Sequence, residues 1–222
     1  METLDEVRQT ITIQLTTDDS DTRSQYLNHF GHQVAEFSDA MSRAFLEWRA
    51  LDGQLGKDER KAYVSALIYC AVALHILSMK LFLSGHTVPA GNLYRQVAET
   101  IALACLCSAK NLDILDRFMQ DKYSTNDALR DAVRHAKRLQ LNADAIEVLR
   151  RTRDFYHEFS HPSQLMIATH MSFSDGNVVL GASFDSGKLE EYRKEVASRV
   201  NLAKVFGNLV SGIRSNISRW KE

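Results

Sequence analysis

Apolar residues recur at steps of three and four along most of this chain, which is the spacing of one face of an α-helix. The clearest case follows the acidic run 18–21, whose Asp and Ser side chains favour the start of a helix. The apolar positions after that run are Tyr26, Phe30, Val34, Phe37, Met41, Phe45 and Trp48. They predict a long amphipathic helix to about Leu51, with its aromatic stripe facing a core.

Two further segments are more apolar than a surface helix requires. Residues 58–84 predict one helix, which Gly85 ends, and residues 90–109 predict another, which is apolar nearly all round from Ala98 onward. A membrane-spanning helix needs about 20 apolar residues. His75 and Lys80 interrupt the first segment, so we expect a buried core helix there and no membrane span.

Shorter periodic segments follow, and a long one closes the chain. They predict helices at 111–121, 124–139, 144–161 and 188–219. The last of these carries a long apolar seam, which, like the seam at 18–51, could serve a homodimer.

The period changes before the last helix. Gln164–Phe173 and Asn177–Phe184 hold β-branched and apolar residues, and Ser174-Asp175-Gly176 between them is a turn signal. We therefore expect an all-α fold: a helical bundle of five to six principal helices, with a small β-hairpin before the last long helix. The whole chain, 1–222, forms a single domain in this reading, and residues 1–17 form a short helix or a loose N-terminal arm.

Charge and the N-terminus narrow the class of protein. The chain has 27 Lys and Arg against 28 Asp and Glu, for a net charge of −1, so no bulk positive field indicates nucleic acid or an anionic membrane. A local basic patch remains compatible with RNA. The N-terminus lacks the basic region and apolar core of a secretory signal, so we expect a cytoplasmic protein without a membrane partner.

The three cysteines bear on metal and redox chemistry. Cys70, Cys105 and Cys107 lie in apolar helical runs, and their number is odd. We expect reduced, buried thiols. Cys105-Leu106-Cys107 lacks the spacing and partners of a zinc or redox motif, so we expect no metal and no cofactor.

The candidate chemistry gathers on the helix predicted at 144–161. At 100° per residue, one side of this helix holds Arg150, Arg153, Asp154, His157 and His161. The opposite side holds Val148, Thr152, Phe155 and Phe159, with Tyr156 at the border. A helix that buries its aromatic side would hold the arginines and histidines together in a row.

This row suits cleavage of RNA without a metal. An imidazole can accept a proton near pH 7 and return it, and a guanidinium binds phosphate in a planar fork. His157 would abstract the 2′-hydroxyl proton or protonate the leaving oxygen, and an arginine would stabilise the developing charge. Asp154 would orient an arginine or an imidazole.

Two short motifs occur in a fixed order. Arg95 and Glu99 share a face of the helix at 90–109. Later come Tyr156, Phe159, Ser160, His161 and Pro162-Ser163, ahead of the predicted hairpin. This order, over roughly residues 60 to 215, resembles the HEPN superfamily (higher eukaryotes and prokaryotes nucleotide-binding), and within it a branch of uncharacterised bacterial HEPN-like proteins. On this resemblance, Tyr156 and Ser160 would support the site together with Arg95 and Glu99.

The resemblance implies an all-α fold and, for catalytic members, an arginine followed after four to six residues by a histidine, in a dimer whose two motifs face each other. Arg150 fits with six residues before His157, and Arg151 fits with five, but only Arg150 shares the face of the histidine. The polar residue that usually follows the family arginine would be Arg151 or Thr152, and neither is typical. This departure concerns catalysis and leaves the expected fold in place.

Three interpretations of the row stay open. It is an ordinary solvated helix face, or the site of a ribonuclease, or part of a non-catalytic module that binds nucleotide, RNA or a partner protein. A ribonuclease of this kind would be a toxin or defence effector, working as a homodimer and controlled by an antitoxin or operon partner. The Arg95–Glu99 pair either fixes helix packing or orients the row.

Overall fold

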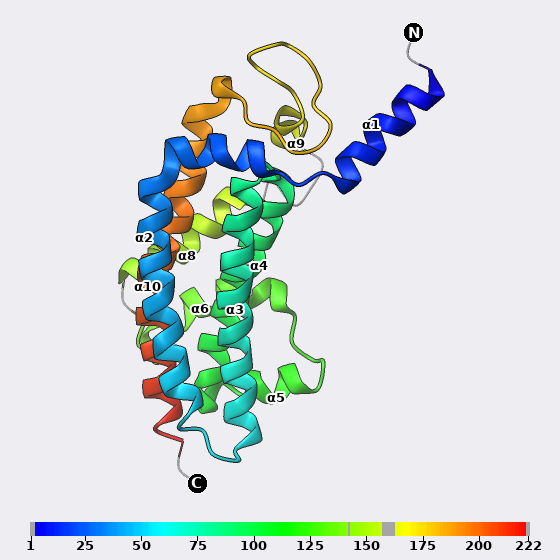
Figure 1. The fold of residues 1–222 in the computed structure, drawn as a ribbon. Helices are drawn as coiled ribbons and strands as arrows, with labels where there is room; N and C mark the ends of the chain where they lie inside the picture. Colours follow the sequence, from blue (N-terminus) through cyan, green and yellow to red (C-terminus); the bar gives the residue numbers. More distant parts are fainter. Residues whose placement is uncertain (1–2, 142, 157–162, 221–222) are drawn as a thin grey trace.

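The computed structural model describes residues 3–141, 143–156 and 163–220, and within them the chain is almost entirely helical. Figure 1 shows the helices in order. Their bounds are α1 Leu4–Thr16, α2 Ser20–Asp52, α3 Glu59–Leu83, α4 Thr87–Ser108, α5 Ile114–Met119, α6 Ala128–Arg134, α7 Ala136–Leu139, α8 Ala143–Tyr156, α9 Gln164–Thr169 and α10 Leu189–Ile217. The expected all-α helical bundle is confirmed.

The body of the bundle consists of α2, α3, α4 and α10, which lie side by side along most of their length (Figure 1). α4 occupies the centre, since it packs on α3 and α10 and also carries the short helices α5, α6 and α8. From Ile101 to Ser108 every residue of α4 is buried, as its apolar sequence predicts. α8 is held between α4 and α10.

α3 is a core helix on one side only. Its inner face, with Val64, Ile68, Val72 and Met79, is buried against α2 and α4. Its outer face is exposed and carries Cys70, so the expectation that all three cysteines are buried is wrong for this one. By length and composition α3 is the one described helix that could cross a membrane, but 44% of its most apolar window is buried inside the bundle.

The described part of the chain holds more helices than the five to six principal ones expected. The segment predicted at 111–121 starts with a short 3-10 turn, Lys110–Leu112, and continues as α5 after Asp113, whose φ of 53° interrupts the helix. The segment predicted at 124–139 divides into α6 and α7 at His135. Aspartate favours helix ends and turns over the interior of a helix, which accounts for the break at Asp113.

The predicted β-hairpin is not present in the described residues. Its first half begins as α9, because the hydroxyl of Ser163 accepts a hydrogen bond from the backbone N–H of Met166 and so caps a helix. The apolar run 165–168 is too short to distinguish a strand from a turn and a half of helix.

The second half of the predicted hairpin forms a loop, which a single antiparallel bridge between Met171 and Val178 joins to the first half. The chain does turn where expected, with Gly176 at a φ of 70°. The carboxylate of Asp185 accepts the backbone N–H of Phe173, a donor that a strand ladder would have used. Val178 is 80% exposed, so no packing surface stabilises an isolated hairpin here.

The N-terminal residues form a helix that stands away from the bundle (Figure 1). The side chain of Thr3 and that of Glu6 cap α1 reciprocally. None of its residues is buried, and Leu4 and Leu15 are 74% and 80% exposed. A short helix or a loose arm was expected for residues 1–17. The structure has a helix there, and this helix extends from the bundle as an arm.

Candidate functional site

α8 orients the first of the predicted site residues toward solvent. Leu149 and Thr152 are buried against α4 and α10, whereas Arg150 and Arg151 are exposed. The division into an inner and an outer side therefore follows the helical spacing of the sequence.

Arg150 is already paired. Its guanidinium donates two hydrogen bonds of 3.0 Å to Glu147, and Arg151 donates one of 2.6 Å to the same carboxylate. These hydrogen bonds lower the pKa of Glu147, the one from Arg151 most of all. A phosphate that approaches Arg150 would have to compete with Glu147, although pairs this exposed are worth little in water.

The other predicted residues of the row are described less fully. The structure describes the backbone of Arg153, Asp154 and Tyr156, which lies in α8. It does not describe their side chains. His157, Ser160 and His161 lie outside the described residues. The described chain resumes at Ser163, directly before α9.

Arg95 and Glu99 form the ion pair that the sequence predicts. Arg95 Nε donates to Glu99 Oε1 over 2.8 Å, and the side chains are 23% and 15% exposed. The pair lies one residue from Tyr94, whose hydroxyl donates to the backbone oxygen of Ser198 over 2.7 Å and lies 3.5 Å from the hydroxyl of Thr152. Tyr94 therefore lies at the junction of α4, α8 and α10, and the Arg95–Glu99 pair occupies the next turn of α4.

The centre of the bundle contains a second ion pair, which was not among the residues predicted from the sequence. Arg199 is fully buried, and its guanidinium binds the carboxylate and the backbone oxygen of Glu195, one turn earlier on α10. Arg199 Nε donates to the hydroxyl of Ser78 over 3.2 Å. The guanidinium carbon lies 4.8 Å from the ring centre of Phe82 and 5.1 Å from that of Tyr94. Such enclosure favours cation–π attraction.

His75 lies next to this pair and is also fully buried. Its Nε2 is 3.1 Å from the backbone oxygen of Arg199, and its Nδ1 makes no hydrogen bond within the described part of the chain. Burial, reinforced by the positive charge of Arg199, lowers the pKa of His75 to about 3. The imidazole is therefore neutral at physiological pH and stacks on Phe206 with ring centres 5.9 Å apart.

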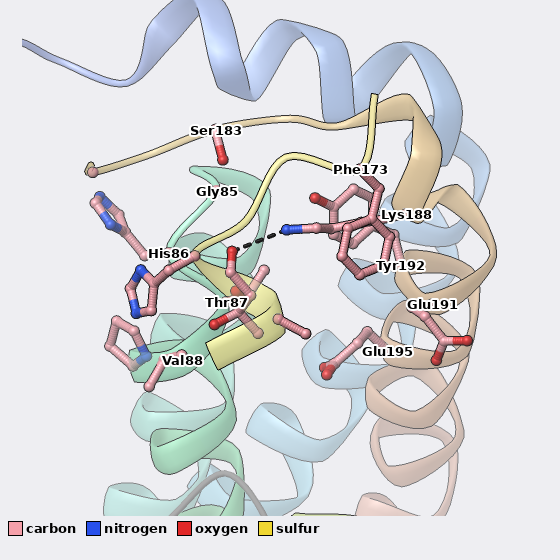
Figure 2. A pocket seen from close by; sticks show the side chains of 15 residues that line it. Gly85, His86, Thr87, Val88, Phe173, Ser183, Lys188, Glu191, Tyr192 and Glu195 are labelled. Carbon is pink, nitrogen blue, oxygen red and sulfur yellow. Dashed lines mark hydrogen bonds between the residues drawn. The ribbon is translucent and has the colours of Figure 1, made fainter. Parts of the chain in front are cut away.

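A cavity of about 290 Å³ opens above this buried cluster. The first turn of α4, the end of α9, the loop 170–183 and the start of α10 enclose it, and Figure 2 shows its lining. Its walls are mainly apolar, with Val88 and Pro89 on one side and the rings of Phe173 and Tyr192 on the other. Glu195 also lines the cavity, so the buried ion pair reaches its floor.

Lys188 extends into this cavity from the turn before α10 (Figure 2). It is 8% exposed, its Nζ donates to the backbone oxygen of Thr169 over 3.0 Å, and it lies 5.2 Å from the ring centre of Phe173. Burial lowers the pKa of Lys188, and the nearby charge of Asp185 opposes that shift. Within the described part of the chain no carboxylate lies within ion-pair distance of Lys188.

The sequence did contain a signal for the missed pair. Glu195 and Arg199 stand four residues apart, at seam positions of a helix whose neighbouring apolar residues are buried. A charged pair at buried spacing predicts an ion pair in the core. The sequence around Lys188 contains no such signal. Its position beside the cavity depends on how the loop 170–187 packs over the ends of α4 and α10.

The described residues contain no group of three His, Cys, Asp or Glu side chains that could hold a metal ion. Searches of protein-family models, of curated proteins and of solved structures returned no match.

Proposed function

We propose that this protein is a HEPN-like helical module that binds a small anionic ligand of the nucleotide class in the cavity beside Lys188. One observation carries the proposal: an ammonium group buried in the wall of a cavity, with one of its three donors used by Thr169 and no carboxylate paired with it in the described chain. A phosphate or carboxylate of a ligand would complete its coordination, and a buried charge without such a partner is costly.

The lining fits the rest of such a ligand. A cavity of about 290 Å³ is at the lower end of the range for small-molecule sites, roughly 300–1,000 Å³. The rings of Phe173 and Tyr192 offer flat apolar surfaces against which a base could pack. The expected function is recognition, in a cytoplasmic protein, without turnover.

Calorimetry with nucleoside monophosphates, the corresponding nucleosides and inorganic phosphate tests this proposal. We expect a monophosphate to bind, and Lys188→Met to weaken it by roughly 10- to 100-fold, since a hydrogen bond to a charged group is worth about 1.5–3 kcal/mol. Lys204→Met is the matched control, because Lys204 lies on α10, away from the cavity, and pairs with Glu36 at the surface. Equal affinity of the two variants, or of nucleoside and monophosphate, would contradict the proposal.

A metal-independent ribonuclease is the second candidate. It is supported by the exposure of Arg150 on α8, on the side that the sequence assigns to the Arg–His row. In this function Arg150 would bind the scissile phosphate and His157 would transfer the proton, with an antitoxin or operon partner as regulator.

The ribonuclease is tested by incubating labelled RNA with the protein in EDTA. We expect His157→Ala to abolish cleavage without changing the melting temperature, and His32→Ala, at an exposed histidine of α2, to leave cleavage intact. Equal cleavage by wild type and His157→Ala would assign the activity to a contaminant or another site.

A further inference from the structure

The outer face of α3 is a continuous apolar surface. Its large side chains are 42–49% exposed although the helix belongs to the core of the bundle. The exposed residues of this face, in order, are Ala62, Tyr63, Ala66, Tyr69, Cys70, Ala73, Ile76 and Leu77. They span about 22 Å along the helix at 1.5 Å per residue. A contiguous apolar surface of this kind marks an interaction site more often than chance exposure does.

The face widens onto the neighbouring helix. The indole of Trp48, from α2, lies 4.9 Å from the ring centre of Tyr69 and donates to the backbone oxygen of Ser65. Tyr69 is therefore held by an aromatic neighbour, in a rigid position that suits an interface anchor.

Charge is confined to the two ends of the face. Glu59 precedes it and Lys80 follows it, and both are exposed. Their neighbours Arg60 and Lys61 are paired with Asp116 and Asp58, whereas Glu59 and Lys80 form no ion pair within the described chain. One end of the face is thus negative and the other positive, with uncharged residues between.

We propose that this face is the interface of a two-fold homodimer in which the two α3 helices pack antiparallel. If the two-fold axis passes between Tyr69 and Cys70, Ala66 of each subunit lies level with Ala73 of its partner. These small residues let the helix backbones approach closely, and the two Cys70 thiols come together near the axis.

The same register brings the ends together. Glu59 of each subunit lies level with Lys80 of the partner subunit, and Tyr63 lies level with Ile76 of the partner subunit. One symmetric arrangement therefore buries the apolar residues and forms two ion pairs, each from groups that have no ion-pair partner within the described residues of the single chain. A two-fold interface requires this self-complementarity, and it favours a second copy over a lipid surface, which would match only the cationic end.

This dimer leaves both candidate sites open. α3 packs on α2 and α4, while α8 packs on α4 and α10, and the cavity lies beyond the end of α3. The interface therefore differs from one in which two α8 helices face each other, and it rests on α3 alone.

Sedimentation velocity over a wide concentration range tests the dimer. We expect a dimer in the wild type, and weakening by about tenfold or more in Tyr69→Glu, which places a charge in the apolar face. Glu59→Lys and Lys80→Glu should each weaken the dimer, and the double variant should restore it, since its opposite charges still face each other. This recovery excludes misfolding as the cause of the single effects.

Oxidation with copper phenanthroline provides a second readout. Cys70 should form an intersubunit disulfide, whereas Cys105 and Cys107 are buried within the chain and should not. A protein that stays monomeric at every concentration would overturn the proposal. So would a dimer that tolerates each of the three single substitutions and forms no disulfide through Cys70. Flotation of the monomer with phosphatidylcholine and phosphatidylglycerol vesicles, lost in Tyr69→Glu, would assign the face to a membrane surface instead.

Discussion

The ion pair between Arg199 and Glu195 shows how two opposite charges can be accommodated in the centre of a helical bundle. Both side chains are almost completely buried, and the guanidinium is enclosed by the rings of Phe82 and Tyr94. Removing two charges from water costs several kcal/mol each, which their attraction offsets only when hydrogen bonds satisfy the remaining donors. Ser78 and the backbone of Glu195 supply such bonds.

We therefore expect Arg199→Met to lower the free energy of unfolding by about 3–5 kcal/mol, because it leaves the Glu195 carboxylate buried without its cation. Glu195→Leu combined with Arg199→Met should recover much of that loss. Urea denaturation at pH 7 measures both. Arg193→Met is the control: it breaks an exposed pair with Glu190 on the same helix and should cost less than about 1 kcal/mol. Equal losses in Arg199→Met and Arg193→Met would show that leaving the Glu195 carboxylate without its cation carries no extra cost from burial.

His75 gives a prediction on pH. Its pKa is about 3 in the folded chain and about 6.5 when unfolded, so the unfolded chain binds the proton more readily below neutral pH. The contribution of the neutral His75 side chain to the free energy of unfolding is therefore fully present above pH 6.5 and is lost as the pH falls toward 3. Between pH 7 and 4.5 we expect a loss of about 2–3 kcal/mol from this group, at 1.36 kcal/mol per pKa unit.

His75→Phe isolates this effect. The ring can keep its contacts with Phe37 and Phe206, and the variant has no proton to bind. Between pH 7 and 4.5, the difference in unfolding free energy between wild type and variant should change by about 2–3 kcal/mol. Parallel pH profiles of the two proteins would show that His75 does not bind a proton on unfolding in this range.

At the level of elements, the end of α3 and the loop that returns to α10 are fitted closely together. Gly85 follows α3 with a φ of 83°, and a Cβ built there would lie 2.7 Å from the backbone nitrogen of Ser183. The backbone oxygen of Ser183 would lie at 2.8 Å, and backbone atoms cannot move aside as the end of a side chain can, so an added methyl group would push the loop 181–185 away. That loop forms part of the cavity wall.

Gly85→Ala should therefore lower the free energy of unfolding by more than the 1–2 kcal/mol typical of a left-handed alanine. Gly176→Ala is matched to it, because Gly176 also has a positive φ, of 70°, but a Cβ there meets no atom within 4 Å. We expect the Gly176 variant to lose about 1 kcal/mol and the Gly85 variant clearly more, by chemical denaturation. A larger loss at Gly176 would mean that backbone conformation alone sets the cost.

The long helices could be predicted from the sequence, and the loop before α10 could not. α2 and α10 follow their apolar periods closely, because burial of a continuous seam decides their form. The predicted hairpin at 164–184 failed, since capping by Ser163 and hydrogen bonding to Asp185 outweighed β propensity in a segment with little to bury.

The candidate sites divide in the same way. Arg95 and Glu99 are neighbours on one helix, so spacing alone predicted their pair. The cavity combines Val88, Thr169 and Lys188, which are far apart in the sequence, and only the tertiary fold brings them together. Spacing likewise predicted that Arg150 is exposed, but not that Glu147 would share its charge with two arginines.

At the level of the whole molecule, the proposed interface and the proposed ligand site lie at different places along α3. Tyr69 is 16 residues before Gly85 at the cavity, or about 24 Å along a helix. Residues farther apart than 7–10 Å usually act independently when they share no partner. The two proposals therefore predict that dimerisation and ligand binding are uncoupled.

Tyr69→Glu should dissociate the dimer and leave the dissociation constant of the bound nucleotide within about twofold, while Lys188→Met should do the reverse, as measured by calorimetry and sedimentation. A change of about fivefold or more in ligand affinity on dissociation of the dimer would contradict independence. Because coupling of binding free energies is reciprocal, the ligand would then shift the dimer equilibrium by the same factor. The end of α3 is the element through which such coupling would pass, since Gly85 and His86 line the cavity and Lys80 closes the interface.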